Sequence, residues 1–448
     1  MSETIDRSVD HQERAETALV LHPVRPKDTA LRSREARLNE AVGLAEALDL
    51  DVVESEVAPL RAVVPATLFG KGKVEEYRIL IEAKALDVVV VDDALTPVQQ
   101  RNLEKAWNTK VVDRTGLILE IFGRRARTRE GTLQIQLARL EYERSRLVRT
   151  WTHLERQAGG TGKTGGPGET QIELDRRQIA DRIVRLKREL EDVRRTRTLH
   201  RTQRKKVPHP TVALVGYTNA GKSTLFNRLT RSAVMAENML FATLDPTLRT
   251  VALPNGRPAI LSDTVGFISD LPHELVDAFR ATLEEVQEAD VILHVRDVAN
   301  EDTDAQAADV RAVLARLEAD PEHGRTVVEV WNKLDLVPAE DRETLLARAS
   351  ASGEGGRPRA VAVSAVSGEG CDALLALVST LVDPGDAVEV RAPAGEGEAV
   401  AWLYQHGRVT ERADEDDGGV RLSVRLNPQA LGRFERMFPD ARLRPAAE

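Results

Sequence analysis

Eight residues from Gly216 to Ser223 have the types and the spacing that can hold a phosphate chain. They read Gly-Tyr-Thr-Asn-Ala-Gly-Lys-Ser and match the pattern G-x-x-x-x-G-K-[ST]. In such a loop several backbone N–H groups point at one anion, Lys222 reaches the outer phosphates, and the Ser223 hydroxyl is placed on a magnesium ion. A short apolar run precedes the motif and a helical pattern follows it. The segment therefore predicts a nucleotide-binding loop, with a chance glycine-rich turn as the alternative.

Two later turns indicate guanine as the base. Asn332 to Asp335 (Asn-Lys-Leu-Asp) follows the strand expected at 326–331. An aspartate there can accept hydrogen bonds from the N1–H and 2-amino groups of guanine, and a polar site left unpaired by adenine can discriminate by ~10⁴. Ser364 to Val366 follows another expected strand, and its amides could meet the guanine O6. Asn-Lys-x-Asp alone also fits an ordinary exposed turn, but its order after the phosphate loop predicts a GTPase.

A third segment, Asp263 to Gly266 (Asp-Thr-Val-Gly), closes the strand expected at 258–263. Its aspartate would hold magnesium through water, and the Gly266 amide could bond the γ-phosphate. Thr243 and Thr247 each fit the threonine that completes the magnesium shell, and the spacing leaves both open. We expect the segments around Thr243 and from Gly266 to Phe279 to be switches that GTP orders.

Two positions beside this site bear on hydrolysis. Phe267 follows Asp-x-x-Gly, where Ras-type GTPases carry a water-orienting glutamine, and a phenyl ring cannot hydrogen-bond water. No arginine finger is identifiable in the sequence either, so we expect slow intrinsic hydrolysis that a partner or another group completes. Asn219 could help to place K⁺ beside the phosphates, with a structural bond to the backbone as the alternative.

The composition is that of a globular protein with several domains. Hydrophobic residues make up 42% and charged residues 30% of the 448 residues, which suits two to four domains. The single cysteine, Cys371, excludes an internal disulfide and fits a reducing cytoplasm. No signal segment and no apolar run long enough to span a bilayer is found, so we expect a cytoplasmic protein that is monomeric without its partners.

Positive charge is concentrated in one block of an acidic chain. The net charge is −9, yet residues 124–206 carry 23 Lys and Arg against 11 Asp and Glu. Such a block indicates a surface for a polyanion, with a solvated face of ion pairs as the alternative.

Apolar residues at heptad spacing run from Leu133 to Leu154 and from Ile172 to Val193, which predicts an antiparallel helical hairpin. A capping box from Thr170 to Glu173 is expected to start the second helix, and residues 194–210 to form a basic linker.

The connection of this hairpin, Gly159 to Gly168, contains six glycines. It imitates a second phosphate loop, but a helix rather than a strand precedes it. A flexible linker is one interpretation, and a mobile tip that meets RNA phosphates is the other; scarce aromatic residues argue against base stacking. The residues expected to contact RNA are Arg156, Gly159, Gly160, Lys163, Gly165, Gly166, Gly168, Arg176 and Arg177.

Both ends of the chain predict small α/β domains. In the N-terminal part, strands at 18–21, 50–57, 86–91 and 110–112 alternate with helices near 31–48, 72–85 and 97–107, which predicts a mostly parallel sheet. The stretch from Phe69 to Lys73 is interpreted as a basic turn before a helix, with an ATP or RNA contact as the alternative. After 384 a helix, two strands and a second helix are expected, and no chemistry can be assigned to them.

Together these motifs resemble the HflX family of ribosome-associated GTPases, over nearly the whole chain from about residue 18. The most specific segments are Gly216–Ser223, Leu240–Thr247, Asp263–Phe267, Trp151–Gln157 and Gly165–Gln171. The resemblance implies an N-terminal domain with a helical arm, a Ras-like GTPase domain and a small C-terminal domain. It also implies binding to the large ribosomal subunit, with the tip toward the peptidyl-transferase region, and splitting or rescue of stalled or stressed ribosomes. Some relatives also bind ATP through the N-terminal region.

The resemblance places Mg²⁺ on Ser223 and Thr243, and we expect Lys222, Thr243 and Gly266 to act in hydrolysis. The expected domains are a disordered tail at 1–18, an N-terminal α/β domain at 19–130, a helical arm at 131–205, a P-loop GTPase domain at 206–383 and a C-terminal α/β domain at 384–448. The residues expected around GTP or GDP are Gly216, Tyr217, Thr218, Asn219, Ala220, Gly221, Lys222, Ser223, Phe241, Ala242, Thr243, Leu244, Asp245, Asp263, Thr264, Val265, Gly266, Asn332, Lys333, Leu334, Asp335, Ser364, Ala365 and Val366. Two other functions stay open: a signalling GTPase whose arm binds a protein, and an ATP-driven RNA remodeller.

Overall fold

The computed structural model describes residues 15–26, 32–151, 167–204, 209–232, 240–241, 243–244, 246–269, 280–351, 360–382, 387–415, 418–426, 428–439 and 441–445. The chain forms two compact units, one of Met1–Arg249 with Ile260–Gly368 and one of Thr250–Ala259 with Glu369–Glu448. Among the described helices, none combines the length and the apolar character needed to cross a membrane.

The first unit begins with a four-stranded parallel sheet in the order β2-β1-β3-β4. Alternate valines and leucines of its strands face two sides: Leu19 and Val89 pack with the helices α2 and α3, whereas Val20 and Val90 pack with α1 and α4. The elements are β1 (Thr17–Val24), α1 (Arg34–Glu46), β2 (Asp51–Pro59), α2 (Lys71–Lys84), β3 (Val88–Val91), α3 (Pro97–Trp107), β4 (Lys110–Asp113) and α4 (Arg114–Arg125).

Two predictions in this part need correction. Strand β1 begins at Thr17, inside the predicted tail at 1–18, because the Thr17 N–H and hydroxyl both donate to Asp87 Oδ2, at 2.9 and 2.8 Å, and fix the start of the strand. Helix α4 was not expected. It follows β4 without a break, because Asp113 ends the strand and also caps the helix by accepting from the Gly116 N–H.

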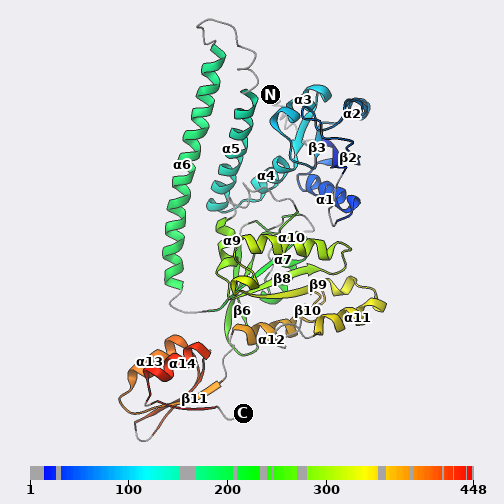
Figure 1. Ribbon diagram of the computed structural model, residues 1–448. Coiled ribbons are helices and arrows are strands. Elements are labelled where there is room, and N and C mark those ends of the chain that lie inside the picture. The colour runs from blue at the N-terminus through cyan, green and yellow to red at the C-terminus, as the bar shows by residue number, and fades with distance from the viewer. Residues whose placement is uncertain are drawn as a thin grey trace, which may run out of the picture. The chain divides into compact units, whose positions relative to one another are not determined.

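The predicted helical hairpin is present. Helices α5 (Arg129–Trp151) and α6 (Pro167–Arg204) lie side by side and run antiparallel (Figure 1). Leu133 of α5 packs with Leu186 and Leu190 of α6, as the heptad pattern predicted. The helix starts at Pro167, which suits a first helical position, so the predicted capping box at Thr170 is wrong and Gly168 lies in the helix.

The basic linker predicted at 194–210 is also wrong in part. Helix α6 continues to Arg204, because neither proline nor glycine occurs between Arg194 and Arg204 to interrupt it. The positive charge of this stretch therefore extends the arm.

The phosphate loop belongs to a six-stranded sheet in the order β10-β9-β8-β5-β7-β6. All the pairs from β10 to β7 are parallel. Its elements are β5 (Thr211–Gly216), α7 (Lys222–Thr230), β6 (Thr247–Ala252), β7 (Pro258–Asp263), α9 (Arg280–Gln287), β8 (Val291–Asp297), α10 (Thr303–Arg316), η1 (Pro321–His323), β9 (Thr326–Asn332), η2 (Leu334–Leu336), α11 (Ala339–Ser350) and β10 (Ala360–Ala362).

One hydrophobic cluster joins the N-terminal sheet to the GTPase sheet. It contains Leu44 and Phe122 from α1 and α4, Ile135 from α5, and Phe241 and Phe267 from the nucleotide-binding part. The rings of Phe122 and Phe241 meet edge to face with their centroids 4.6 Å apart. A movement of the Phe241 segment must therefore disturb the packing of α4.

The second unit contains α12 (Cys371–Val382) and an antiparallel sheet in the order β12-β13-β11-β14. Its other elements are β11 (Ala387–Ala392), α13 (Gly397–His406), β12 (Arg408–Asp414), β13 (Val420–Arg425), α14 (Pro428–Met437) and β14 (Arg442–Pro445). Phe434, Leu403 and Leu422 form the core of the sheet and its two helices. Strands β11 and β14 were not expected, whereas α13, β12, β13 and α14 follow the predicted order of helix, two strands and helix.

Candidate functional site

The phosphate loop connects the end of β5 to the start of α7 and needs glycine at both ends. Gly216 has φ +156°, and a Cβ on it would lie 2.2 Å from the Val295 carbonyl oxygen of β8. Gly221 has φ +91°, and a Cβ on it would lie 2.2 Å from Asn332 Nδ2. Any side chain at either position would displace a neighbouring strand or the base-side turn.

Lys222 lies under the loop with its ammonium group turned inward. Its Nζ donates to the Gly216 and Tyr217 carbonyl oxygens at 3.1 and 2.8 Å. Burial lowers the pKa of this lysine to about 8, and the Asp263 carboxylate opposes that effect. An anion in the loop would compensate the cost of burying the ammonium charge.

Three oxygen-bearing side chains converge beside the loop. Ser223 Oγ donates to Asp263 Oδ2 at 2.7 Å, and Thr243 Oγ1 lies 2.8 Å from Ser223 Oγ and 3.0 Å from the same carboxylate oxygen. Burial raises the pKa of Asp263, an effect that the Ser223 hydroxyl opposes. Thr247, the other candidate from sequence, lies at the start of β6 and makes none of these contacts among the described residues.

The donor set of this cluster fits a magnesium ion. Hydroxyl and carboxylate oxygens are the ligands that Mg²⁺ prefers. Asp263 Oδ1 and Thr218 Oγ1 are buried without a hydrogen-bond partner in the described part of the chain, so both can meet a bound cation or its water. 

The Asp-x-x-Gly segment packs directly on the phosphate loop. A Cβ on Gly266 would lie 2.9 Å from Thr218 Cα and 3.0 Å from Lys222 Nζ. The Phe267 N–H donates to the Gly216 oxygen at 3.0 Å, and the Thr218 N–H donates to the Phe267 oxygen at 2.7 Å. The Phe267 side chain is only 2% exposed, and it lies in the hydrophobic cluster that contains Phe122 and Phe241.

The two base-side turns are tied together and to the phosphate loop. Asn332 Nδ2 donates to the Ala220 oxygen at 2.9 Å, and Asn332 Oδ1 accepts from the Ala365 N–H at 3.0 Å. The exposed Asp335 carboxylate accepts from Ser364 Oγ at 2.6 Å, which fixes its orientation. Both partners of the buried Asn332 amide are therefore protein groups, while the Asp335 side chain stays exposed.

The remaining base-side residues extend these turns. Lys333 has φ +66° and pairs with Asp297 at 2.7 Å, Leu334 is buried, and Val366 is 68% exposed. Thr264 and Val265 are buried, and so is Leu244, which follows Thr243 in the chain. The predicted contacts Ala242, Asp245, Arg156, Gly159, Gly160, Lys163, Gly165 and Gly166 lie outside the described residues.

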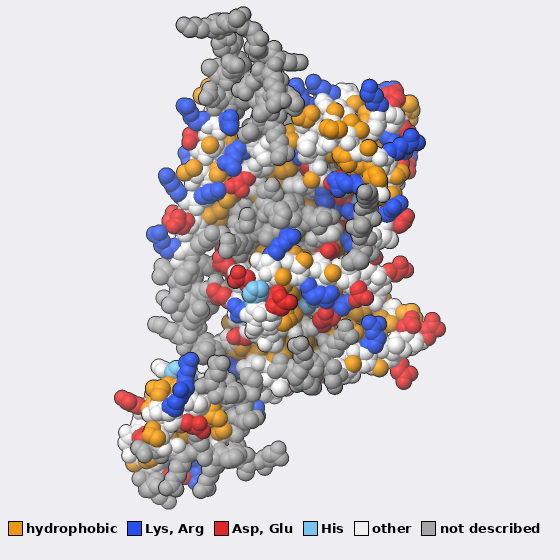
Figure 2. All heavy atoms as spheres, in the orientation of Figure 1, with side chains coloured by type: hydrophobic (Ala, Val, Ile, Leu, Met, Phe, Trp, Pro, Cys, Tyr) orange, Lys and Arg blue, Asp and Glu red, His pale blue; other side chains and the backbone are white. Residues whose placement is uncertain are grey.

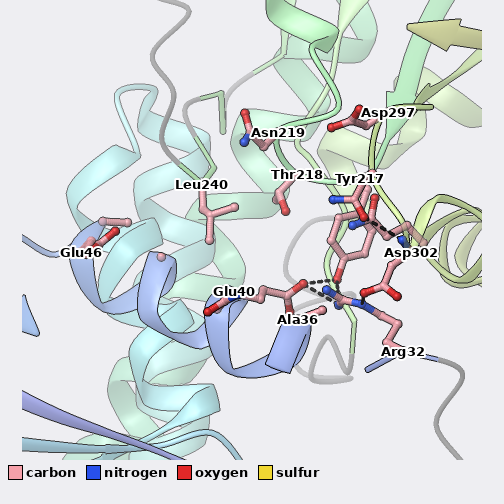
Figure 3. A pocket seen from close by; sticks show the side chains of 15 residues that line it. Arg32, Ala36, Glu40, Glu46, Tyr217, Thr218, Asn219, Leu240, Asp297 and Asp302 are labelled. Carbon is pink, nitrogen blue, oxygen red and sulfur yellow. Dashed lines mark hydrogen bonds and ion pairs between the residues drawn. The ribbon is translucent and has the colours of Figure 1, made fainter. Parts of the chain in front are cut away.

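A pocket of about 420 Å³ opens at the outer side of the phosphate loop. Figure 3 shows α1, with Ala36 and Glu40, facing the turn that carries Thr218 and Asn219. Asn219 is exposed at φ +61°, and no hydrogen bond of its side chain is found among the described residues, so the structural bond considered from sequence gains no support. The wall from α1 was missed, because nothing in a local sequence pattern indicates contact across 177 positions.

Comparisons with known proteins agree with this arrangement. Four family models match consecutive parts of the chain: GTP-binding GTPase N-terminal at 35–123, GTP-binding GTPase middle region at 125–204, 50S ribosome-binding GTPase at 211–333 and HflX C-terminal domain at 344–446.

Three relatives match over most of their length. GTPase HflX of Magnetococcus marinus is 50% identical over 93% of this chain and 94% of its own. GTPase HflX of Escherichia coli is 41% identical over 93% and 95%, and that of Caldanaerobacter subterraneus subsp. tengcongensis is 42% identical over 89% and 90%. The chain therefore belongs to the HflX family and is a P-loop GTP hydrolase.

Proposed function

We propose that this GTPase binds the large ribosomal subunit through its helical arm, in a GTP-dependent manner, and that it splits or rescues stalled ribosomes in the cytoplasm. The observation that carries the proposal is a stiff cationic arm built onto the same unit as the nucleotide site. The match of residues 211–333 to the 50S ribosome-binding GTPase model supports the choice of partner.

The cationic face of the arm suits RNA phosphates. Arg176, Arg177, Arg182, Arg185 and Arg188 are exposed on α6, and none has a carboxylate partner among the described side chains. Figure 2 shows Lys and Arg side chains spaced along the outer edge of the arm. Unpaired cations at helical spacing bind a phosphate backbone without base readout and release its counterions.

The nucleotide site supports binding of GTP with Mg²⁺. Ser223, Thr243 and Asp263 would hold the metal, directly or through water, and the metal when bound neutralises charge on the β- and γ-phosphates. Lys222 would bind the outer phosphates, and Asp335 would pair with the guanine N1–H and 2-amino groups. Gly266 lies against Lys222, and its N–H would sense the γ-phosphate.

Hydrolysis at this site would need a group other than Phe267 to orient the attacking water or to stabilise the developing negative charge. The phenyl ring is buried in the core and cannot orient water. Asn219 is an exposed residue of the phosphate loop, where its amide oxygen could hold K⁺ against the developing negative charge. We propose that K⁺ or a ribosomal group supplies this missing stabilisation.

The arm is tested by sedimentation with large subunits in a GTP analogue at increasing salt. Arg185→Ala with Arg188→Ala should weaken binding and reduce the slope of log affinity against log salt by about 0.9 per lost phosphate contact. The matched control replaces Arg101 and Lys105, exposed on α3, and should leave the slope unchanged. Deletion of 159–168 should remove the contact of the tip.

The proposal fails if wild-type protein does not sediment with large subunits, or if both pairs of substitutions give the same slope. Salt-independent capture of a protein by the arm would favour the signalling GTPase instead. Hydrolysis of ATP that survives Lys222→Ala would favour the RNA remodeller.

A further inference from the structure

The N-terminal sheet has a topological feature that usually marks a binding site. In the order β2-β1-β3-β4, strand β2 lies on one side of β1 and strand β3 lies on the other side. The order of the strands therefore reverses direction at β1. Ligands of open parallel sheets bind outside the carboxyl ends of the strands at such a point. His22 near the end of β1, Asp92 directly after β3 and Arg114 directly after β4 all lie at this edge, and all are buried.

These residues form a continuous polar cluster with Glu40 of α1. His22 Nδ1 lies 2.7 Å from Asp92 Oδ2, and Arg114 donates to Asp92 Oδ1 at 2.5 Å and to Glu40 Oε1 at 2.7 Å. Burial raises the pKa of Glu40, but the Arg114 and Arg32 guanidinium groups more than offset this and hold it below its usual value. Buried charges of this kind need partners on every side.

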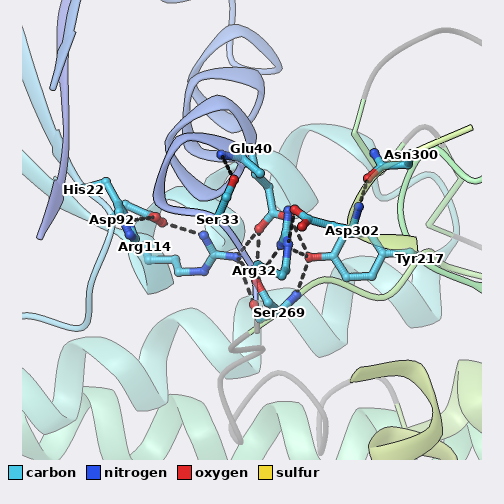
Figure 4. Close-up of polar contacts among 11 residues, drawn as sticks. His22, Arg32, Ser33, Glu40, Asp92, Arg114, Tyr217, Ser269, Asn300 and Asp302 are labelled. Atoms are coloured by element: carbon cyan, nitrogen blue, oxygen red, sulfur yellow. Dashed lines mark hydrogen bonds and ion pairs between the residues drawn. The ribbon is translucent and has the colours of Figure 1, made fainter. Parts of the chain in front are cut away.

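Further partners for Glu40 and Arg114 come from the GTPase part of the chain. Figure 4 shows two of them, Tyr217 and Ser269, at the edge of the cluster. Arg114 Nη2 donates to the Ser269 carbonyl oxygen at 2.9 Å, and Ser269 Oγ donates to Glu40 Oε1 at 3.1 Å. Tyr217 Oη donates to Glu40 Oε2 at 2.5 Å and accepts from the Ser269 N–H at 2.8 Å. Tyr217 belongs to the phosphate loop, and Ser269 follows Gly266 by three residues, so the edge holds a segment expected to respond to GTP.

The second nucleotide-responsive segment also contacts this part of the molecule. Phe241, two residues before Thr243, packs on Phe122 of α4. Leu240 packs on α1, where a Cβ on Gly43 would lie 3.3 Å from the Leu240 side chain. Polar and apolar contacts thus attach both segments to the same two helices.

From the same edge a second set of contacts reaches the arm. Asp113, the neighbour of Arg114 in the chain, accepts from the Tyr142 hydroxyl at 2.5 Å and from Arg146 Nη2 at 2.6 Å. Both donors lie on α5. The side chain of Asp113 is almost fully buried, so these bonds are shielded from water.

We propose that the carboxyl edge of the N-terminal sheet is a binding site for the segment Phe267–Ser269, and that Arg114 and Asp113 couple its position to α5 of the arm. GTP would shift the position of this segment relative to its position with GDP. Such a shift can reach α5 only if GTP and GDP stabilise different positions of the segment. The coupling rests on the nucleotide part of the proposed function and does not require a ribosome.

Reciprocity gives the test. If GTP and GDP stabilise the contacts of α5 with Asp113 to different extents, then weakening those contacts must change the ratio of the dissociation constants for GTP and GDP by the same factor. Tyr142→Phe removes one hydroxyl on α5, outside the nucleotide site. The control Tyr77→Phe removes a hydroxyl that donates to Glu56 at 3.1 Å elsewhere in the same sheet domain. Dissociation constants of a fluorescent GTP analogue and of fluorescent GDP are measured on the full chain without ribosomes.

Tyr142→Phe should change the ratio of the two dissociation constants by about fivefold, whereas Tyr77→Phe should change it less than twofold. Equal ratios in wild type and Tyr142→Phe would overturn the proposal. A second measurement uses the unmodified protein, so that it does not depend on the folding of a variant. Hydrogen exchange of 114–125 and 139–146 should differ between GDP and the GTP analogue, and identical exchange would overturn the coupling even if ribosome binding is confirmed.

Discussion

The choice of Thr243 over Thr247 can be tested by removing each hydroxyl in turn. The Thr243 hydroxyl lies 2.8 Å from Ser223 Oγ and 3.0 Å from Asp263 Oδ2, so Thr243→Ala removes a hydrogen bond to a buried carboxylate. Such bonds contribute ~1.5–3 kcal/mol. The expected loss in apparent Mg²⁺ affinity is therefore about 10- to 150-fold. Loss of groups that orient a metal ligand costs a similar ~10- to 100-fold.

The assay is single-turnover GTP hydrolysis over a range of Mg²⁺ concentrations. Thr243→Ala should raise the concentration for half-maximal rate by at least about tenfold. Thr247→Ala, on β6, should change it by less than about threefold, because no contact with the oxygen cluster depends on that side chain. Equal effects of the two substitutions would refute the assignment drawn from the geometry.

Three further predictions concern the same site. Gly221→Ala should lower the melting temperature about 4–8 °C more than Gly324→Ala, measured by calorimetry, because both have positive φ but only the first displaces the Asn332 amide and its two hydrogen bonds. The affinity for GDP should be constant below pH 8 and fall about tenfold per unit above it, since Lys222, with its pKa lowered to about 8 by burial, must then take up a proton to bind phosphate; a flat titration to pH 9.5 would contradict this. Asp335→Ala should reduce the preference for GTP over ATP by ~10² or more in competition binding, and an unchanged preference would place guanine recognition elsewhere.

Local patterns predicted the strands that precede the nucleotide motifs and the helix that follows the phosphate loop. Strand β7 has the predicted bounds, and the order of strand, glycine loop and helix at Gly216–Ser223 is confirmed. These elements are predictable because their signals, an apolar run and glycines at fixed spacing, lie within a few residues of each other. The misses have a common cause. Strand β11 is stabilised by pairing with β13 and β14 far along the chain, and Asp113 serves both a strand and a helix without a turn signal.

Spacing alone also could not choose between Thr243 and Thr247, and the buried cluster of Glu40, Arg114 and Tyr217 was not foreseen. Charged residues are normally assigned to the surface, and only the meeting of segments separated by 74 and 177 positions makes their burial favourable. Tyr217 belongs to the phosphate-loop motif, whereas Glu40 and Arg114 stand in no motif, and the sequence assigned them no function.

We propose that the occupant of the phosphate loop governs how the arm engages ribosomal RNA. The most direct measurement is the dissociation constant for large subunits at one fixed salt concentration, with a GTP analogue and then with GDP. We expect binding at least about tenfold tighter with the analogue, because GTP would stabilise the arrangement that fits the ribosome. Equal dissociation constants in the two states would contradict it.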